Sequence, residues 1–232
     1  MVYRLENRFV IFNYFDIGTG FHKLKDQIQL PQLLPHKVKP VKYGLKLYFA
    51  MSTTSQFTRK NFMINQQYTT VFIDRDGTIG GNGHFQSLED FKLYPYTLEA
   101  IDKLKRNNIK VFGLSNQTHI EDGKMNYYDF FNSLISVGFD DAFICPHSEK
   151  TNCNCRKPKK GLIDQAHAKY YFENSQSIII GDRYSSDITL ALDCDMLGVH
   201  VGTGKQETNK RSNCDKVIYV KTLKDAVDYI VK

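Results

Sequence analysis

Two aspartates stand at the end of a run of β-forming residues. Residues 71–73 (Val-Phe-Ile) lead directly into Asp74, and Asp76 follows before a turn at Gly77 and Thr78. Carboxylates held close together raise each other's pKa, because like charges repel. Such a pair is typical of a site where a cation lies between them, or where one is ionised and the other protonated. Alone, the pattern also fits a solvated turn or a calcium loop, although the further acidic ligands of a calcium loop are missing.

Polar side chains also follow three other predicted strands. The carboxyl ends of parallel strands meet at one edge of a sheet, where ligands bind, so we expect these side chains to lie near the two aspartates. Each group alone also fits an ordinary turn, a helix cap or a solvated basic run. The groups are Ser115-Asn116-Gln117 after strand 110–114, Arg156-Lys157 after strand 142–144, and Asp182 with Asp187 after strand 177–180.

These residue types predict phosphoryl transfer. Asp74, Asp182 and Asp187, with the backbone carbonyl of Asp76, can surround Mg²⁺, which also accepts a phosphate oxygen. Asp74 can then attack phosphorus as a nucleophile. Asp76 can protonate the leaving oxygen and later activate the water that hydrolyses the intermediate.

Four further side chains are candidates for holding the substrate. The hydroxyl of Ser115 and the positive charge of Lys157 can stabilise the phosphoryl oxygens in the transition state. Asn116 and Arg156 are predicted to bind the substrate, because they flank these two residues in the sequence.

Three of the five cysteines lie within eleven residues of one another, together with a histidine. Cys145, Cys153, Cys155 and His147 supply three thiolates and one imidazole, the ligands of a closed tetrahedral Zn²⁺ site. Because no coordination position is left open, we expect this zinc to be structural and to hold the loop that carries the basic pair. Buried free thiols are the alternative.

Strands alternate with helices from about residue 69 onward. This alternation predicts an α/β fold, a Rossmann-like parallel sheet with helices on both faces. The interval between the first two strands leaves no room for a large cap domain. The predicted strands are 70–74, 110–114, 142–144, 177–180, 199–201 and 217–220; the predicted helices begin at Thr97, as the cap, and at Ser185 or Ser186, and span 127–137, 161–172 and 222–231.

In this order, the motifs resemble those of the haloacid dehalogenase-like phosphatase superfamily. The string from Cys145 to Pro158 (Cys-Pro-His … Cys-Asn-Cys-Arg-Lys-Pro) resembles the branch that contains D-glycero-D-manno-heptose-1,7-bisphosphate 7-phosphatases and the histidinol-phosphatase domain. The resemblance covers about residues 69–230. It implies a magnesium-dependent phosphatase with an aspartyl-phosphate intermediate, acting on a small phosphorylated metabolite in carbohydrate metabolism.

One stretch departs from the pattern of that family. Residues 118–123 read Thr-His-Ile-Glu-Asp-Gly, where the family has a Gly-Ile-x-Arg-Gly type of sequence. Acidic residues in place of a basic one disfavour a bisphosphate substrate. Histidinol phosphate is the nearest alternative substrate. An oligonucleotide 3′-phosphate is a more distant one, because the N-terminal segment is basic and related phosphatase domains act on such ends. A binding module with a basic arm is the non-enzymatic alternative. His84 and His119 can border the pocket, although a lone loop histidine also fits an ordinary surface position.

The basic residues are concentrated at the N-terminus. Residues 1–66 hold ten Lys or Arg against three Asp or Glu (10 − 3 = +7), and the remainder holds 21 against 22 (21 − 22 = −1). The near-neutral body disfavours nucleic acid as a partner. We divide the chain into a basic, irregular extension (1–66) and a phosphatase domain (67–232). No apolar run approaches the ~20 residues of a membrane span, and no secretory signal is recognised, so we expect a cytoplasmic protein. We also expect a monomer.

Overall fold

The computed structural model describes residues 2–5, 8–11, 68–205 and 214–232. The chain divides into two units, residues 1–56 and 57–232. In the first unit, strands β1 (Val2–Leu5) and β2 (Arg8–Ile11) pair antiparallel. We predicted an irregular extension that ends at residue 66. Apart from β1 and β2, this prediction concerns residues outside the described ranges.

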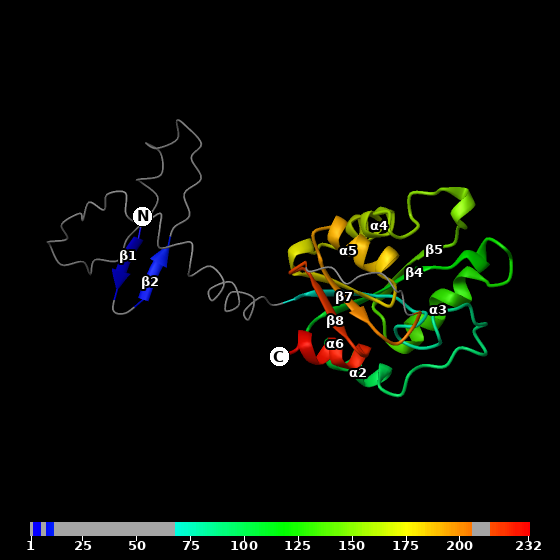
Figure 1. Ribbon diagram of the computed structural model, residues 1–232, viewed down its shortest axis with the longest axis horizontal. Coiled ribbons are helices and arrows are strands. Elements are labelled where there is room, and N and C mark those ends of the chain that lie inside the picture. The colour runs from blue at the N-terminus through cyan, green and yellow to red at the C-terminus, as the bar shows by residue number, and fades with distance from the viewer. Residues whose placement is uncertain (1, 6–7, 12–67, 206–213) are drawn as a thin grey trace. The chain divides into compact units, whose positions relative to one another are not determined.

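The second unit contains a parallel six-stranded sheet, as predicted (Figure 1). The order of the strands is β5-β4-β3-β6-β7-β8, so β3 and β6, which precede the two pairs of aspartates, are neighbours at the centre. Their apolar runs are fully buried, as is typical of parallel strands covered on both faces. The strands are β3 (Thr70–Ile73), β4 (Lys110–Asn116), β5 (Asp141–Cys145), β6 (Ser177–Gly181), β7 (Leu197–Val201) and β8 (Val217–Val220).

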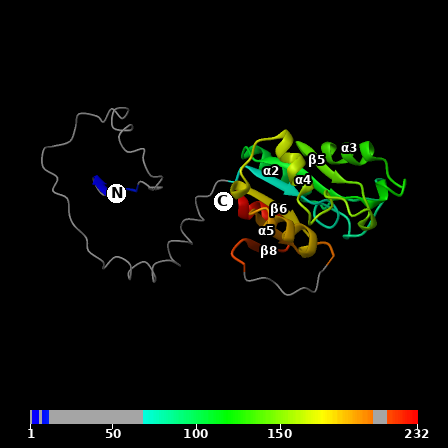
Figure 2. The same cartoon turned by 90° about the horizontal axis from the view of Figure 1, so that it is seen from above.

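Helices cover both faces of this sheet, which confirms the predicted architecture (Figures 1 and 2). One face packs against α2, α3 and α6, and the other against α4 and α5. Successive side chains of β3 pack on opposite faces of the sheet, because side chains of a strand point alternately to opposite sides. Val71 and Ile73 join the first core, and Phe72 joins the second. The helices are α2 (Thr97–Arg106), α3 (Tyr127–Val137), α4 (Gly161–Lys169), α5 (Thr189–Asp193) and α6 (Leu223–Ile230).

Side chains cap two of these helices. The Asn126 side chain accepts hydrogen bonds at the start of α3, and Thr222 forms a capping box with Asp225 at the start of α6. The prediction that Thr97 caps α2 is wrong. Tyr96 occupies that position, and the Thr97 hydroxyl instead donates to the backbone oxygen of Ile79 at 2.7 Å. The hydroxyl therefore ties α2 to the loop after β3.

Short helical turns connect the strands to the main helices. The segment after β6 begins with a π-helical turn, η5 (Tyr184–Ile188), which carries Asp187, before α5. A π turn of this kind occurs frequently at functional sites. The remaining turns are the 3₁₀ segments η2 (Thr118–Ile120), η3 (Glu149–Thr151) and η4 (Asn174–Gln176).

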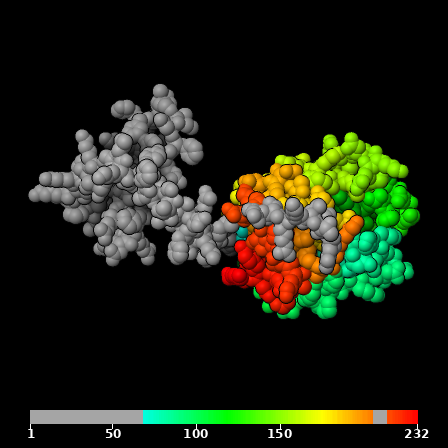
Figure 3. Space-filling view, in the orientation of Figure 1, coloured from blue at the N-terminus to red at the C-terminus, as the bar shows by residue number. Residues whose placement is uncertain are grey.

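The carboxyl ends of the strands gather at one end of this unit. Figure 3 shows the residues after β3 (cyan to green) and after β5 (yellow-green) at the same end, away from the C-terminal helix (red). Among the described residues, no helix is both long and apolar enough to span a membrane.

Replacing Phe72 with alanine is expected to destabilise the second unit by about 3–5 kcal/mol, because it leaves a cavity among packed rings. Phe72 is fully buried, and its ring centroid lies 5.5 Å from that of Phe112 and 5.3 Å from that of Phe172. Urea unfolding followed by circular dichroism measures the loss. The matched control is Leu98→Ala on the exposed side of α2, which should change the unfolding free energy little. Equal losses in both variants would contradict the packing argument.

Candidate active site

Lys157 lies between two carboxylates at the centre of the candidate site. Its Nζ donates to Asp74 Oδ1 at 2.7 Å, to Asp187 Oδ1 at 2.6 Å and to the backbone oxygen of Leu114 at 2.6 Å. Burial alone lowers the pKa of Lys157, but the two carboxylates outweigh that effect, so the pKa is raised and the ammonium stays charged. The structure thus brings together residues that are 83 and 30 positions apart in the sequence.

A third carboxylate, from Asp182, completes an acidic group. Oxygens of Asp74, Asp182 and Asp187 lie within 4.8 Å of one another. Asp182 Oδ2 accepts the Lys205 backbone N–H at 2.7 Å, whereas its buried Oδ1 has no hydrogen-bond partner in the described part of the chain. Burial, followed by the negative charge of Asp74, raises the pKa of Asp182 to about 7. A buried, unpartnered oxygen among carboxylates that repel each other fits a position for a divalent cation.

Two glycines allow these carboxylates to approach the backbone. Gly77 has a φ of +86°, and a Cβ atom there would lie 2.5 Å from Asp182 Oδ2. A Cβ atom on Gly181 would overlap the Asp187 carboxyl group. A larger residue at either position would therefore displace one of the acidic side chains.

Asp76 is held by two donors, Gln117 from the group expected beside the two aspartates and Arg75, to which the sequence assigned no role. Its Oδ1 accepts from Arg75 Nη1 at 2.7 Å, and its Oδ2 accepts from Gln117 Nε2 at 2.6 Å. Burial raises the pKa of Asp76 to about 6, although both hydrogen bonds oppose that shift. A carboxyl group with a pKa near neutrality can both give and take a proton.

Ser115 and Asn116 lie at the end of β4 and have different surroundings. The buried Ser115 Oγ has no hydrogen-bond partner among the described residues, so it is available to a ligand. Asn116 lines the pocket, but Oδ1 accepts the Lys157 N–H at 2.9 Å and Nδ2 donates to the Lys157 carbonyl at 3.1 Å. This geometry favours a role in positioning Lys157 over the substrate-binding role predicted from the sequence.

A cavity of about 410 Å³ opens above these groups. It is lined by the predicted residues Asp74, Asp76, Asn116, Arg156 and Lys157, and by His84 and His119. Several lining residues were not expected, because nothing in a single loop sequence shows which way its side chains point. These are Gly83, Phe85, Thr118, Glu149, Pro158, Arg183, Ser185 and Ser186, whereas Gln117 belongs to the group expected beside the two aspartates.

The rings of Phe85 and His119 line one part of this cavity, and we call this pair the aromatic wall. Their centroids lie 3.7 Å apart, and Phe85 is 44% exposed. Arg183 Nη2 donates to the Gly83 carbonyl at 2.6 Å and so fixes the loop that carries Phe85. A partly exposed ring in a cavity can pack against a ligand ring.

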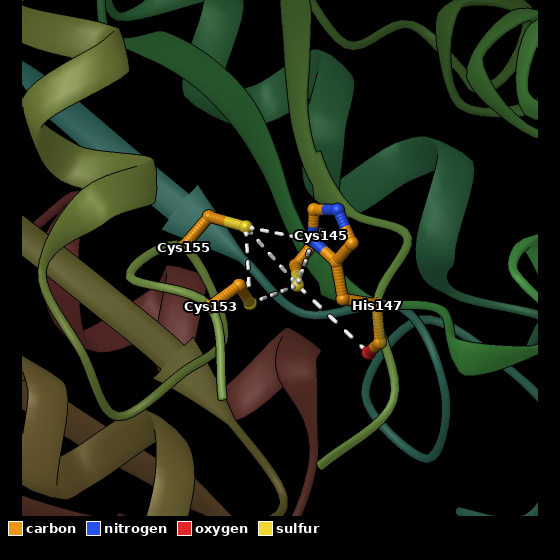
Figure 4. Close-up of side chains that lie close together, drawn as sticks. All are labelled: Cys145, His147, Cys153 and Cys155. Atoms are coloured by element: carbon orange, nitrogen blue, oxygen red, sulfur yellow. Dashed lines mark hydrogen bonds between the residues drawn. The ribbon is translucent and has the colours of Figure 1, made fainter. Parts of the chain in front are cut away.

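Four possible metal ligands converge in the loop after β5 (Figure 4). Cys155 Sγ lies 3.3 Å from Cys145 Sγ and 3.4 Å from Cys153 Sγ, and His147 Nδ1 lies 3.3 Å from Cys155 Sγ. Bonds of about 2.3 Å to sulfur and about 2.0 Å to nitrogen in a tetrahedral zinc site would separate the ligand atoms by about 3.5–3.8 Å, so the cluster fits such an ion closely. The cysteines are not joined by disulfides. Burial raises the pKa of the Cys145 thiol to about 12, so a cation is needed to hold three thiolates here.

Two charged side chains, those of Glu121 and Arg156, connect this loop to the segment after β4. Glu121 accepts the Ser148 N–H at 2.5 Å and the Thr151 hydroxyl at 2.6 Å. Arg156 Nη1 donates at 3.1 Å to both the Thr118 hydroxyl and the His147 carbonyl. The acidic Glu121 is therefore engaged with the cysteine loop and is not among the residues that line the cavity.

Known proteins resemble this chain in sequence and in fold. A family model described as HAD-hydrolase-like matches residues 154–226. A Thermoplasma acidophilum protein named "Probable D-glycero-D-manno-heptose-1,7-bisphosphate 7-phosphatase" is 31% identical over 137 residues, which cover 55% of this chain and 86% of the relative.

Two further similarities involve a longer protein and a solved structure. The histidine biosynthesis bifunctional protein HisB of Campylobacter jejuni is 32% identical over 145 residues, or 57% of this chain. The chain spans about two fifths of that relative's length (41%). The crystal structure of a heptose 1,7-bisphosphate phosphatase from B. bronchiseptica, complexed with magnesium and phosphate, has a TM-score of 0.60 at 21% identity. It covers 70% of this chain and 98% of its own, and this similarity shows the shared fold.

Replacing Lys157 with leucine is expected to destabilise the second unit by about 3–5 kcal/mol at neutral pH, because it leaves two carboxylates without their cation. The pKa of Asp187 is raised by burial and lowered by Lys157, so the variant should raise it further. The loss of stability should therefore be largest at a pH above the pKa of Asp187 in the variant. It should shrink in mildly acidic buffer, where this carboxyl group is protonated. Chemical unfolding at several pH values tests this.

Lys224→Met is the control for that measurement, because Lys224 forms an exposed ion pair with Asp228. It should change stability little at any of these pH values. A pH-independent deficit in Lys157→Leu would contradict the proposed electrostatic cause.

Proposed function

Because this chain belongs to the haloacid dehalogenase-like hydrolase family, we propose that it is a magnesium-dependent phosphatase that hydrolyses a phosphomonoester of a small metabolite. The observation that carries the proposal is a group of three carboxylates at a cavity, two of which bond to the charged, buried Lys157. Such a centre is suited to a reaction in which negative charge must be held at a carboxylate nucleophile.

The magnesium site would consist of the Asp74, Asp182 and Asp187 side chains and the backbone carbonyl of Asp76. The unpartnered Oδ1 of Asp182 and the raised pKa values of Asp182 and Asp187 support this assignment. When bound, Mg²⁺ neutralises charge on the phosphoryl oxygens.

The reaction follows from the positions of the remaining groups. Asp74 attacks phosphorus, and the ester P–O bond breaks as the Asp76 carboxyl group gives its proton to the leaving oxygen. Asp76, now ionised, then takes a proton from the water that attacks the aspartyl-phosphate, which releases phosphate and regenerates Asp74. The Ser115 hydroxyl and the Lys157 ammonium stabilise the phosphoryl oxygens throughout.

We assign a structural zinc ion to Cys145, His147, Cys153 and Cys155. The short ligand separations and the absence of disulfides in this cluster support it. The ion would fix the loop that leads into Lys157.

Cys155→Ser should abolish or strongly reduce the zinc content of the purified protein, because it removes one of four ligands. It should also lower the thermal unfolding temperature. Zinc content is measured by mass spectrometry of the metal. Cys214→Ser is the matched control, since Cys214 lies outside the cluster and should leave the zinc content unchanged. Unchanged zinc in Cys155→Ser would contradict the assignment.

Two substrates are candidates, and a different observation supports each of them. The named relatives and the guanidinium groups of Arg156 and Arg183 at the cavity support a sugar bisphosphate such as D-glycero-D-manno-heptose 1,7-bisphosphate. The aromatic wall of Phe85 and His119 favours a substrate with a flat ring, such as histidinol phosphate.

A phosphate-release screen with Mg²⁺ tests the proposal. We expect turnover of at least one small phosphomonoester, and Asp74→Asn should reduce kcat by more than about 10³-fold without loss of folding. The panel includes both candidate metabolites and an oligonucleotide 3′-phosphate. Asp102→Asn, which alters an exposed ion pair on α2, is the control and should retain activity. Failure to release phosphate from any ester, or full activity in Asp74→Asn, would contradict the proposal.

A further inference from the structure

Asp76 receives a hydrogen bond on each carboxylate oxygen from a different part of the fold. Arg75 precedes it in the loop after β3, and Gln117 comes from the end of β4, 41 residues along the chain. The two donor distances, 2.7 and 2.6 Å, are at the short end of the range for N–H···O bonds. We call Arg75 and Gln117 the Asp76 fork.

The guanidinium of Arg75 is unusually buried for a charged group. Arg75 is only 2% exposed. Its Cζ lies 3.5 Å from the centroid of the Phe91 ring and 5.0 Å from that of Phe130. Taking this charge out of water is costly unless it is paired, and rings stacked on a guanidinium offset only part of that cost. The hydrogen bond to Asp76, which is an ion pair whenever that carboxyl group is ionised, offsets part of the remaining cost.

Gln117 is also buried, at 4% exposure, and lines the catalytic cavity. Its backbone N–H donates to the Cys145 carbonyl at 2.8 Å, which fixes the start of its side chain between β4 and β5. Both arms of the fork are therefore anchored to the sheet or the core, and neither is a flexible surface side chain.

We propose that Arg75 and Gln117 are positioning residues that aim the Asp76 carboxyl group at the leaving oxygen of the substrate. This inference rests on the proposed phosphatase function, in which Asp76 is the proton donor. A carboxyl group offers about four acceptor positions, and the fork occupies one on each oxygen. The carboxyl group is thereby fixed in its plane while positions remain for the proton that is transferred.

The fork matters because proton transfer depends on geometry. General acid catalysis needs the donor within hydrogen-bond distance of the leaving oxygen, and it contributes about 10²–10⁴-fold to the rate. Lys157 donates to Asp74 and Asp187, whereas the side-chain donors to Asp76 are Arg75 and Gln117. Without the fork, rotation about its side-chain bonds would take the proton away from the bond that breaks.

The test compares three phosphate esters that differ in how much the leaving oxygen needs a proton. These are 4-nitrophenyl phosphate, whose leaving group departs readily as an anion, phenyl phosphate, and benzyl phosphate, whose alkoxide departs poorly unless protonated. The quantity measured is kcat/KM with Mg²⁺, because it reports the steps up to leaving-group departure and excludes the later hydrolysis of the intermediate.

Arg75→Met and Gln117→Leu should each make kcat/KM depend more steeply on the leaving group. We expect a loss of about 10²-fold on benzyl phosphate, a smaller loss on phenyl phosphate and the smallest on 4-nitrophenyl phosphate. Asp76→Asn sets the upper limit for this steepening. Arg75→Lys, which restores the positive charge with a different donor geometry, should recover part of the loss on benzyl phosphate.

Arg106→Met is the matched control, because it removes an arginine–aspartate pair on the exposed surface of α2 and should leave all three values unchanged. Equal losses on the three esters, or no loss in either fork variant, would overturn the proposal, since a purely structural role does not discriminate between leaving groups. If Arg75→Met does not fold, Gln117→Leu and Arg75→Lys decide the matter. Absence of turnover in the unaltered protein on every ester would instead contradict the phosphatase function itself.

Discussion

The ammonium group of Lys157 makes it possible for several carboxylates to share one buried site. Asp74 and Asp187 both bond to it, and Asp182 lies within the same group. Without a positive charge in this position, the acidic side chains would repel each other in surroundings that solvate charge poorly. The close approach of these acidic side chains, which Gly77 and Gly181 permit, therefore depends on this interaction.

Much of the loop after β5 serves to hold that lysine. Asn116 bonds both the N–H and the carbonyl of Lys157, and Arg156 ties the same segment to the loop after β4. The cluster of three cysteines and one histidine closes the loop on its other side, and Glu121 bonds to the loop from the segment after β4. A long loop costs conformational entropy to order, so it needs these separate attachments to deliver one ammonium group accurately.

The two aspartates that follow β3 have different surroundings despite their separation of two residues. Asp74 bonds to the ammonium of Lys157, whereas Asp76 lies between Arg75 and Gln117, and burial raises its pKa to about 6. Because side chains that follow a strand take separate directions, one motif places two carboxyl groups in different environments. The division of labour that we propose for them rests on these environments and not on residue type.

The sequence by itself determined the α/β architecture, the order of the strand-end motifs and the membership of the cysteine cluster, because these depend on local patterns of apolar, acidic and thiol residues. It did not reveal that Gln117 and Arg75 hold Asp76, that Asn116 bonds to the backbone of Lys157, or that Glu121 faces the cysteine loop. It also did not show that Phe85 packs on His119, or that the Thr97 hydroxyl bonds away from its own helix. These are contacts between residues distant in sequence or between side chains of irregular loops, and their directions are set only when the strands take their places in the sheet.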